Sequence, residues 1–263
     1  MIRGATKRFA LGLAGLFSTL WRVVPALVRK KVFFGMFVLE SRQRDPAEGL
    51  RRLLEIKDKL DLTINERAMA YGKAEHPKHR LTRYHDFFVN RITDGERVLD
   101  IGCGYGAVAR SIARAHSNSV VVGVDQDVPR LTQARSSENP ENLRFHEGDA
   151  TKSVPEGPWD VVVLSNVLEH IHDRVGLLVA LQTSTHAARY LIRVPLFERD
   201  WQMALRRELG VDFRSDDDHK IEHTLAEFQA EAEQAGLVID HMATLWGEIW
   251  AECSLASPQV IAR

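Results

Sequence analysis

The chain has little cysteine: among its 263 residues only Cys103 and Cys253 occur. Two widely separated cysteines exclude the disulfide framework of a small secreted domain and suit a reducing compartment. A clean membrane-spanning run is also missing, because Arg22 and Pro25 interrupt the apolar stretch 9–28. No small-residue cleavage site follows this stretch, which disfavours a signal peptide.

Acidic residues are absent from positions 1–39, which hold seven of the 35 Lys and Arg and therefore carry +7. The remaining 28 basic residues, set against 36 acidic ones, leave −8 on the rest of the chain, although the net charge is only −1. A basic head on an acidic body predicts an anionic partner for the head alone. We expect no nucleic acid partner, because the body is acidic.

Residues 7–30 are expected to form a helix with two faces. One stripe is basic or small, whereas the opposite side is rich in Phe, Leu and Val, with Trp21 at its border. This combination is typical of a helix that lies in the membrane interface. We therefore expect residues 1–45 to associate with a membrane, with residues 7–31 on the anionic inner face of the cytoplasmic membrane. A helix packed on protein, a spanning helix and a signal segment are the alternatives.

The composition turns charged at Asp45-Pro46, which marks a boundary. Apolar spacing predicts an amphipathic helix over 47–62, and Pro77 is placed to begin a second helix that runs to Ile92. We expect residues 46–92 to form a helical lead-in to the main domain.

The motif Val98-Leu-Asp-Ile-Gly-Cys-Gly-Tyr-Gly106 is the centre of the main domain, residues 93–263. Residues with strand character lead into three alternate glycines, and apolar residues at helical spacing follow. Glycines let the backbone turn sharply and let a ligand approach, while the next helix N-terminus offers unpaired N–H groups. The motif predicts a cradle for a nucleotide-like ligand.

Asp100, two positions before the first glycine, discriminates between ligands. Gly102, Gly104 and Ala107 also satisfy the loose dinucleotide fingerprint. A fixed carboxylate beside the turn, however, repels a pyrophosphate and favours the sulfonium and ammonium of S-adenosylmethionine. The motif resembles the first motif of class I S-adenosylmethionine-dependent methyltransferases. Dinucleotide binding is the alternative.

The strands that follow end in groups suited to the rest of this cofactor. Asp125 ends the predicted strand 119–125, and its carboxylate can accept hydrogen bonds from both ribose hydroxyls. In the methyltransferases that the chain resembles, the acid at Asp149 binds the adenine amino group and the next backbone N–H meets a ring nitrogen. The residues predicted to bind the cofactor are Asp100, Gly102, Cys103, Gly104, Gly106, Asp125, Gln126, Asp149, Ala150 and Asn166.

The resemblance implies a doubly wound α/β fold with seven mostly parallel strands. Residues 237–255 contain two adjacent predicted strands. A closing antiparallel hairpin is characteristic of class I methyltransferases and not of dinucleotide-binding dehydrogenases.

The segment 165–173 resembles the matching motif of ubiquinone-pathway O-methyltransferases, which have Glu-Val-x-Glu-His there and attach to membranes. Glu169 and His170 agree with that pattern, whereas Asn166 replaces its first Glu. Some members of that branch bind a divalent ion through these acids; with one carboxylate missing, we expect no metal. His170 is the predicted general base, because an ordinary imidazole pKa near 6.5 suits neutral pH.

The segment 195–222 is longer than a strand–helix connection needs, so we expect it to recognise the acceptor. His219, within it, is a second candidate base. The residues predicted to contact the acceptor are Tyr71, Arg80, Tyr84, Arg193, Arg199 and Trp201. Of these, Arg193 and Arg199 suit a carboxylate or phosphate on the acceptor.

These patterns predict an S-adenosylmethionine-dependent methyltransferase that O-methylates a lipid-linked, glycan or other amphiphilic small molecule at the membrane surface. A loose resemblance of the region 193–250 to methyltransferases of cell-surface glycan and lipid pathways agrees with this. The alternatives are a soluble enzyme acting on a small metabolite, and a non-catalytic or dehydrogenase-like nucleotide-binding protein.

Overall fold

The computed structural model describes residues 18, 20–72 and 76–256. The chain divides into two compact units, residues 1–66 with 209–211, and residues 67–208 with 212–263.

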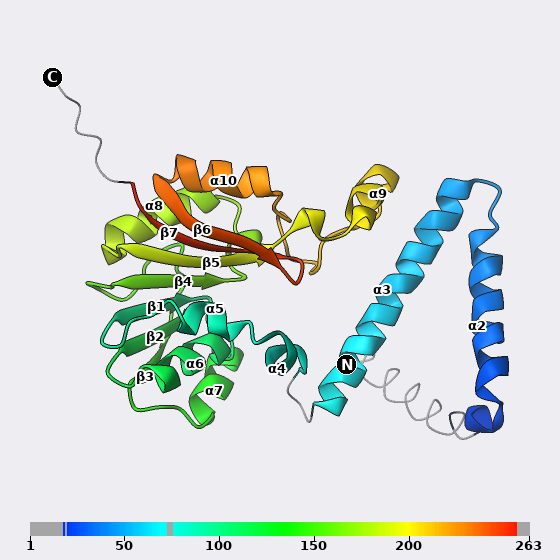
Figure 1. Cartoon of the computed structure of the whole chain (residues 1–263), viewed down its shortest axis with the longest axis horizontal. Coiled ribbons are helices and arrows are strands. Elements are labelled where there is room, and N and C mark those ends of the chain that lie inside the picture. Colours follow the sequence, from blue (N-terminus) through cyan, green and yellow to red (C-terminus); the bar gives the residue numbers. More distant parts are fainter. Residues whose placement is uncertain (1–17, 19, 73–75, 257–263) are drawn as a thin grey trace. The chain divides into compact units, whose positions relative to one another are not determined.

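A seven-stranded sheet forms the centre of the larger unit, with the strand order β3-β2-β1-β4-β5-β7-β6 (Figure 1). β1 to β5 run parallel, and β7 is antiparallel to both β5 and β6. This confirms the predicted doubly wound, mostly parallel α/β fold with a C-terminal antiparallel hairpin. The strands are β1 (Arg97–Ile101), β2 (Val120–Asp125), β3 (Leu143–Glu147), β4 (Val161–Ser165), β5 (Arg189–Pro195), β6 (Leu237–Leu245) and β7 (Glu248–Leu255).

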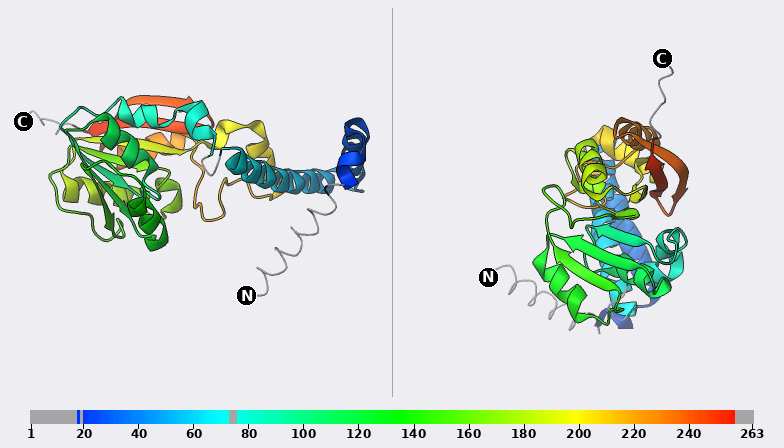
Figure 2. Two further views of the ribbon diagram at one scale, coloured as in Figure 1. Left: turned by 90° about the horizontal axis from the view of Figure 1, so that it is seen from below. Right: turned by 90° about the vertical axis from the view of Figure 1, so that its left-hand side faces the viewer.

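Helices cover both faces of this sheet, as Figures 1 and 2 show. Phe88 and Ile112 contribute to the apolar core on one face, whereas Leu181 and Phe228 contribute to the core on the other. The central strands are therefore apolar on both sides, as buried parallel strands require. The helices of this unit are α4 (Lys78–Thr82), α5 (His85–Val89), α6 (Ala107–Ala115), α7 (Val128–Ser136), η1 (Leu168–His170), α8 (Arg174–Thr185), η2 (Phe197–Arg199), α9 (Trp201–Leu209) and α10 (Leu225–Gln234).

The strand order reverses beside β1, which pairs with β2 on one side and with β4 on the other. Ligands of open α/β sheets bind at the carboxyl ends of the strands at such a reversal. Asp100 and Asp125 lie at the ends of β1 and β2, and Asn166 directly follows β4. The topology thus brings these three predicted residues to one edge of the sheet.

One predicted helix of this unit is wrong in detail. The helix expected from Pro77 to Ile92 is instead two short helices, α4 and α5. Arg83 has φ of +47° and ends α4. A residue in the left-handed region cannot continue a right-handed helix, so the hydrogen-bond ladder stops there.

The smaller unit contains α2 (Ala26–Ser41) and most of α3 (Pro46–Tyr71). α3 begins at the predicted boundary but is much longer than the expected helix over 47–62. None of the helices in the described residues is long and apolar enough to cross a membrane.

The helix expected over 7–30 is not continuous. The described part is interrupted at Val24 and Pro25, and α2 then continues to Ser41. Proline lacks an N–H and restricts the residue before it, which explains the break. Residues 7–17 and 19 lie outside the described residues, so the amphipathic character of this segment stays a prediction.

Candidate active site

The glycine turn between β1 and α6 has a defined shape. Gly102, Gly104 and Gly106 have φ of +64°, +53° and +74°, in the left-handed region that favours glycine. The Cys103 N–H donates to the Val124 carbonyl of β2 at 3.0 Å, and the Gly106 N–H donates to the Cys103 carbonyl at 2.8 Å. Backbone hydrogen bonds therefore hold the turn against its neighbouring strand.

Close packing adds a second reason for glycine in this turn. A Cβ on Gly106 would overlap the ring of Phe145, whereas a Cβ on Gly104 would have no neighbour within 4 Å. Burial raises the pKa of the Cys103 thiol, so this side chain is a packing group rather than a nucleophile.

Asp100 is buried, and its Oδ2 has no hydrogen-bond partner. Burial raises the pKa of this carboxyl to about 7; the Ala109 N–H opposes the rise and the charge of Asp125 adds to it. An unpartnered carboxylate oxygen beside the glycine turn is suited to a cationic ligand.

Asp125 ties the turn to β2. Its Oδ2 accepts a hydrogen bond from the Gly104 N–H at 2.7 Å, and its Oδ1 accepts one from the Asp127 N–H at 2.8 Å. Asp149, at the next strand end, pairs with Lys152 at 2.8 Å. Hydrogen bonds from Lys152 and Thr151 lower the pKa of Asp149 to about 2, so this group is ionised at neutral pH.

Two cavities meet at these strand ends. The smaller, of about 210 Å³, includes Asp125, Gln126, Asp149 and Ala150 in its lining. The larger, of about 640 Å³, is lined by residues that include Tyr84, Asp100, Cys103, Glu169, Arg193, Arg199 and His219. Gly102, Asn166 and His170 line both cavities. The two cavities therefore adjoin. The smaller suits the nucleoside of a cofactor, and the larger suits its reacting group together with an acceptor.

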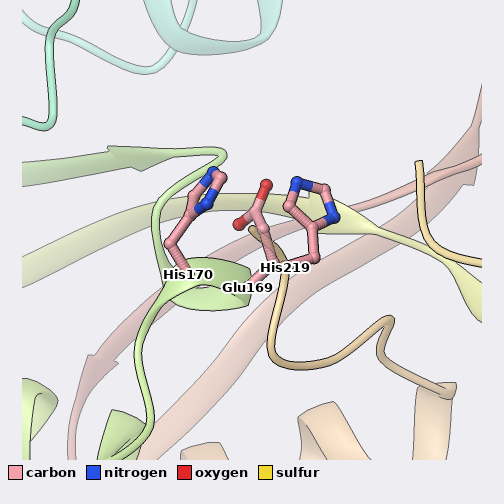
Figure 3. A group of neighbouring side chains, drawn as sticks. All are labelled: Glu169, His170 and His219. Carbon is pink, nitrogen blue, oxygen red and sulfur yellow. The ribbon is translucent and has the colours of Figure 1, made fainter. Parts of the chain in front are cut away.

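Glu169, His170 and His219 converge in the larger cavity. Figure 3 shows the Glu169 carboxylate between the two imidazoles. Glu169 and His170 belong to η1, whereas His219 comes from the insertion 195–222. The imidazole rings meet edge to face, with centroids 4.6 Å apart. The fold thus joins two groups that the sequence places far apart.

Glu169 is fully buried, and no hydrogen bond of normal geometry reaches either carboxylate oxygen. Burial raises its pKa to about 7; its own backbone N–H, the Asn166 side chain and the charge of His219 act in the opposite direction. Burial also lowers the pKa of His170, although Asp218 lies 3.2 Å from His170 Nδ1 and opposes this shift.

The Glu222 carboxylate supports the imidazole of His219. His219 Nδ1 lies 3.0 Å from Glu222 Oε1, which also accepts hydrogen bonds from the Ser215 N–H at 2.5 Å and the Ser215 hydroxyl at 2.9 Å. Burial lowers the pKa of His219, but its bond to Glu222 and the charge of Glu169 outweigh this, so the net direction is upward. Glu222 could not be predicted from the sequence, because its partners meet only in the folded insertion.

The two arginines predicted to contact the acceptor already have carboxylate partners. Arg193 forms a bidentate ion pair with Glu248. Its guanidinium carbon lies 4.3 Å from the ring centroid of Tyr84 and 4.9 Å from that of Trp250. Arg199 pairs with Glu222 through Nη1 alone, and its guanidinium also donates to the carbonyls of Leu196 and Phe213. An anionic group on the acceptor would have to compete with these internal carboxylates.

Comparisons with known proteins agree with this geometry. Residues 98–185 match the methyltransferase domain family. The chain is 30% identical to the ribosomal protein L11 methyltransferase of Thermotoga maritima over 171 residues, which cover 65% of this chain and 61% of that protein. It is 29% identical to the ubiquinone biosynthesis O-methyltransferase of Aeromonas salmonicida over 159 residues, which cover 57% and 66%. The chain contains an S-adenosylmethionine-dependent methyltransferase domain.

A solved structure supports the same fold for this chain. Magnesium protoporphyrin IX methyltransferase from Synechocystis PCC 6803, with S-adenosylhomocysteine bound, has a TM-score of 0.52 and 16% identity, covering 68% of this chain and 83% of that one. The chain spans about three fifths of the length of its Thermotoga relative. S-adenosylmethionine is the cofactor of this class. This decides between S-adenosylmethionine and a dinucleotide, the two ligands that the glycine motif alone allowed.

Most of the site residues predicted from the sequence line the two cavities. Gly104 and Gly106 shape the turn, and the other predicted cofactor residues line one cavity or both. Of the predicted acceptor contacts, Tyr84, Arg193 and Arg199 line the larger cavity. Tyr71, Arg80 and Trp201 do not; Tyr71 is 77% exposed on α3 and Trp201 is 71% exposed on α9.

Proposed function

We propose that this methyltransferase transfers the methyl group of S-adenosylmethionine to a hydroxyl oxygen of an amphiphilic small molecule. The observation that carries the proposal is the meeting of the two cavities at Asn166 and His170. This junction supports a cofactor bound on the glycine turn beside the cluster formed by Glu169, His170 and His219. The sequence similarity to ubiquinone biosynthesis O-methyltransferases supports an oxygen acceptor.

The reaction would be an in-line displacement. The acceptor oxygen forms a bond to the methyl carbon while the carbon–sulfur bond breaks, S-adenosylhomocysteine leaves, and the hydroxyl proton passes to the cluster. Alignment of donor and acceptor supplies most of the rate in such a transfer. His170 and His219 are the proposed proton acceptors, since both face the larger cavity.

Transfer of a labelled methyl group tests this function. The full chain is incubated with methyl-labelled S-adenosylmethionine and a lipid extract, and the organic and aqueous phases are counted separately. We expect label in the organic phase, and we expect conversion of Glu169→Gln to fall at least about 100-fold, the size of effect typical of lost acid–base chemistry. Glu147→Gln, an exposed change at the end of β3, is the matched control. Label in the aqueous phase alone would favour a soluble acceptor, and no label in either would contradict the proposal.

The smaller unit supports action at a membrane surface. α2 has no buried residue, and its exposed apolar side chains include Leu27, Phe34 and Leu39. The same helix carries the basic run Arg29-Lys30-Lys31. Apolar and basic side chains together suit an interface with anionic lipids.

Charge reversal in α2 tests the membrane contact. Replacing Arg29, Lys30 and Lys31 with Glu is expected to weaken binding to vesicles of anionic phospholipid by at least about 100-fold, because each basic residue near such a surface contributes about 1 kcal/mol. Vesicle sedimentation of the full chain measures this. Reversal of Arg114, Arg144 and Lys152 in the larger unit is the control and should leave binding unchanged. Equal losses in both variants would show only a general charge effect and would contradict a specific contact through α2.

A further inference from the structure

The turn that joins β6 and β7 contains an unusual residue. Leu245 and Glu248 are paired at the ends of the two strands, so the loop between them consists of Trp246 and Gly247 alone. Both loop residues have positive φ, +56° and +77°. Positive φ at both central positions is the arrangement of a type I′ turn, where Asn-Gly is the preferred pair. A bulky aromatic residue in this conformation is a backbone outlier, so the turn itself does not favour tryptophan.

Burial does not explain Trp246 either. Its side chain is 63% exposed, so folding removes little of its apolar surface from water and does not compensate for the strained backbone. Trp246 does line the larger cavity. Strained residues that persist beside a cavity commonly serve a ligand. The indole is therefore a candidate contact for the acceptor.

The turn is held in a fixed position against the insertion 195–222. The Leu196 N–H donates to the Gly247 carbonyl at 3.0 Å. A Cβ on Gly247 would lie 3.2 Å from the Cβ of Arg199, so the two segments pack closely. On the strand side, Trp250 Nε1 donates to the Leu245 carbonyl at 3.0 Å. A contact that is fixed before the ligand arrives loses little conformational entropy on binding.

The lining of the larger cavity indicates which ligand suits this contact. Most of its lining residues are polar or charged. Arg193 and Arg199 already pair with internal carboxylates, which disfavours an anionic ligand. A purely apolar ring would bury polar groups without giving them hydrogen-bond partners, which is costly. A sugar ring carries hydroxyls at its edge for these groups and presents C–H groups on its face, which can pack on an indole.

We propose that Trp246 is a specificity-determining residue whose indole stacks on a neutral sugar ring in the head group of the amphiphilic acceptor. The polar lining of the larger cavity then binds the hydroxyls of this ring, and Trp246 orients the ring without taking part in proton transfer. The inference rests on the proposed function for the methyl transfer itself, whereas binding of the ring requires no transfer.

Saturation-transfer NMR on the full chain, with S-adenosylhomocysteine present, tests the proposal. The probes are the octyl glycosides of glucose, galactose and mannose, each below its micelle concentration, and 4-octylphenol, which carries the same alkyl chain on an aromatic ring. We expect saturation of the sugar-ring protons of at least one glycoside. Its affinity should fall at least about 5-fold in Trp246→Asn, the size of one lost aromatic contact, and should be largely kept in Trp246→Phe.

Thermal unfolding of the same variants separates ligand contact from a structural role. Trp246→Asn should raise the Tm, because Asn tolerates positive φ and suits this turn, whereas a tryptophan that serves the fold would give a lower Tm on replacement. Val238→Thr, an exposed change in β6 of the same hairpin, is the control and should leave glycoside affinity unchanged. S-adenosylhomocysteine binding, measured on every variant, shows that the fold is retained.

Three results would overturn the proposal. They are the absence of binding by every glycoside, equal glycoside affinity in wild type and Trp246→Asn, and tighter binding of 4-octylphenol than of all three glycosides. Because none of these measurements involves methyl transfer, a chain that binds a glycoside through Trp246 but transfers no methyl group would contradict the proposed function alone.

Discussion

Asp100→Asn is expected to weaken S-adenosylmethionine binding by at least about 30-fold, the loss typical when one member of a buried charge pair is removed. The variant keeps the shape of the side chain but removes its charge. The loss should be larger for S-adenosylmethionine than for S-adenosylhomocysteine, because the demethylated product lacks the sulfonium. Calorimetric titration of both compounds, with NAD and NADP as controls, measures the difference. Equal losses for the two compounds would contradict a role for Asp100 toward the sulfonium.

The pH dependence gives the same prediction an independent check. Burial raises the pKa of Asp100 to about 7 in the unliganded chain. A cationic ligand prefers the ionised carboxylate, so below pH 7 binding must first remove a proton. Affinity of the wild type should fall up to tenfold for each pH unit below 7, whereas Asp100→Asn should show no such slope. A flat wild-type profile would contradict the role of this carboxyl.

The same substitution should stabilise the unliganded fold at alkaline pH. A carboxyl whose pKa rises from 3.8 to about 7 on folding binds its proton more tightly in the folded state. Folding stability from this group is therefore full below the unfolded pKa and is lost as the pH rises to 7. The wild type should carry a cost of up to about 4 kcal/mol at pH 8 that Asn lacks. A higher Tm for Asp100→Asn at pH 8, with the difference shrinking at pH 5, is the expected result.

Local patterns in the sequence were sufficient for most of the fold. The glycine turn, the acids at strand ends and the closing hairpin are encoded within short segments, whose apolar spacing sets strands and helices. Asp100, Asp125 and Asn166 come together because parallel strands end at one edge of a sheet. These residues could be predicted without knowing any contact between distant parts of the chain.

Contacts between distant segments could not be predicted in this way. His219 meets Glu169 only because the insertion 195–222 folds back onto η1. No local sequence pattern specifies this contact between the insertion and η1. Arg193 pairs with Glu248 because β5 and β7 are neighbours in the sheet, a consequence of strand order. Tyr71 was predicted to line the acceptor site because the segment before the first strand often does so in the methyltransferases that the chain resembles, but α3 extends to include it.

Gly106→Ala is expected to lower the free energy of unfolding by about 2 to 5 kcal/mol. The left-handed φ of +74° costs a residue with a Cβ about 1 to 2 kcal/mol. The new methyl group would also overlap the Phe145 ring, and such overpacking typically adds about 1 to 3 kcal/mol. Displacing the turn should weaken S-adenosylhomocysteine binding as well, since the proposed cofactor site includes this turn.

Gly104→Ala separates the two causes, because this position has the same sign of φ but no neighbour within 4 Å. Backbone strain alone predicts a loss of about 1 to 2 kcal/mol there. Phe145→Ala added to Gly106→Ala should recover the part due to overlap, so the two changes should couple favourably in a double-mutant cycle. Urea unfolding of the full chain measures the free energies of the four members of this cycle and of Gly104→Ala. Equal losses at the two glycines, or no recovery in the double variant, would show that packing against Phe145 does not dictate glycine at position 106.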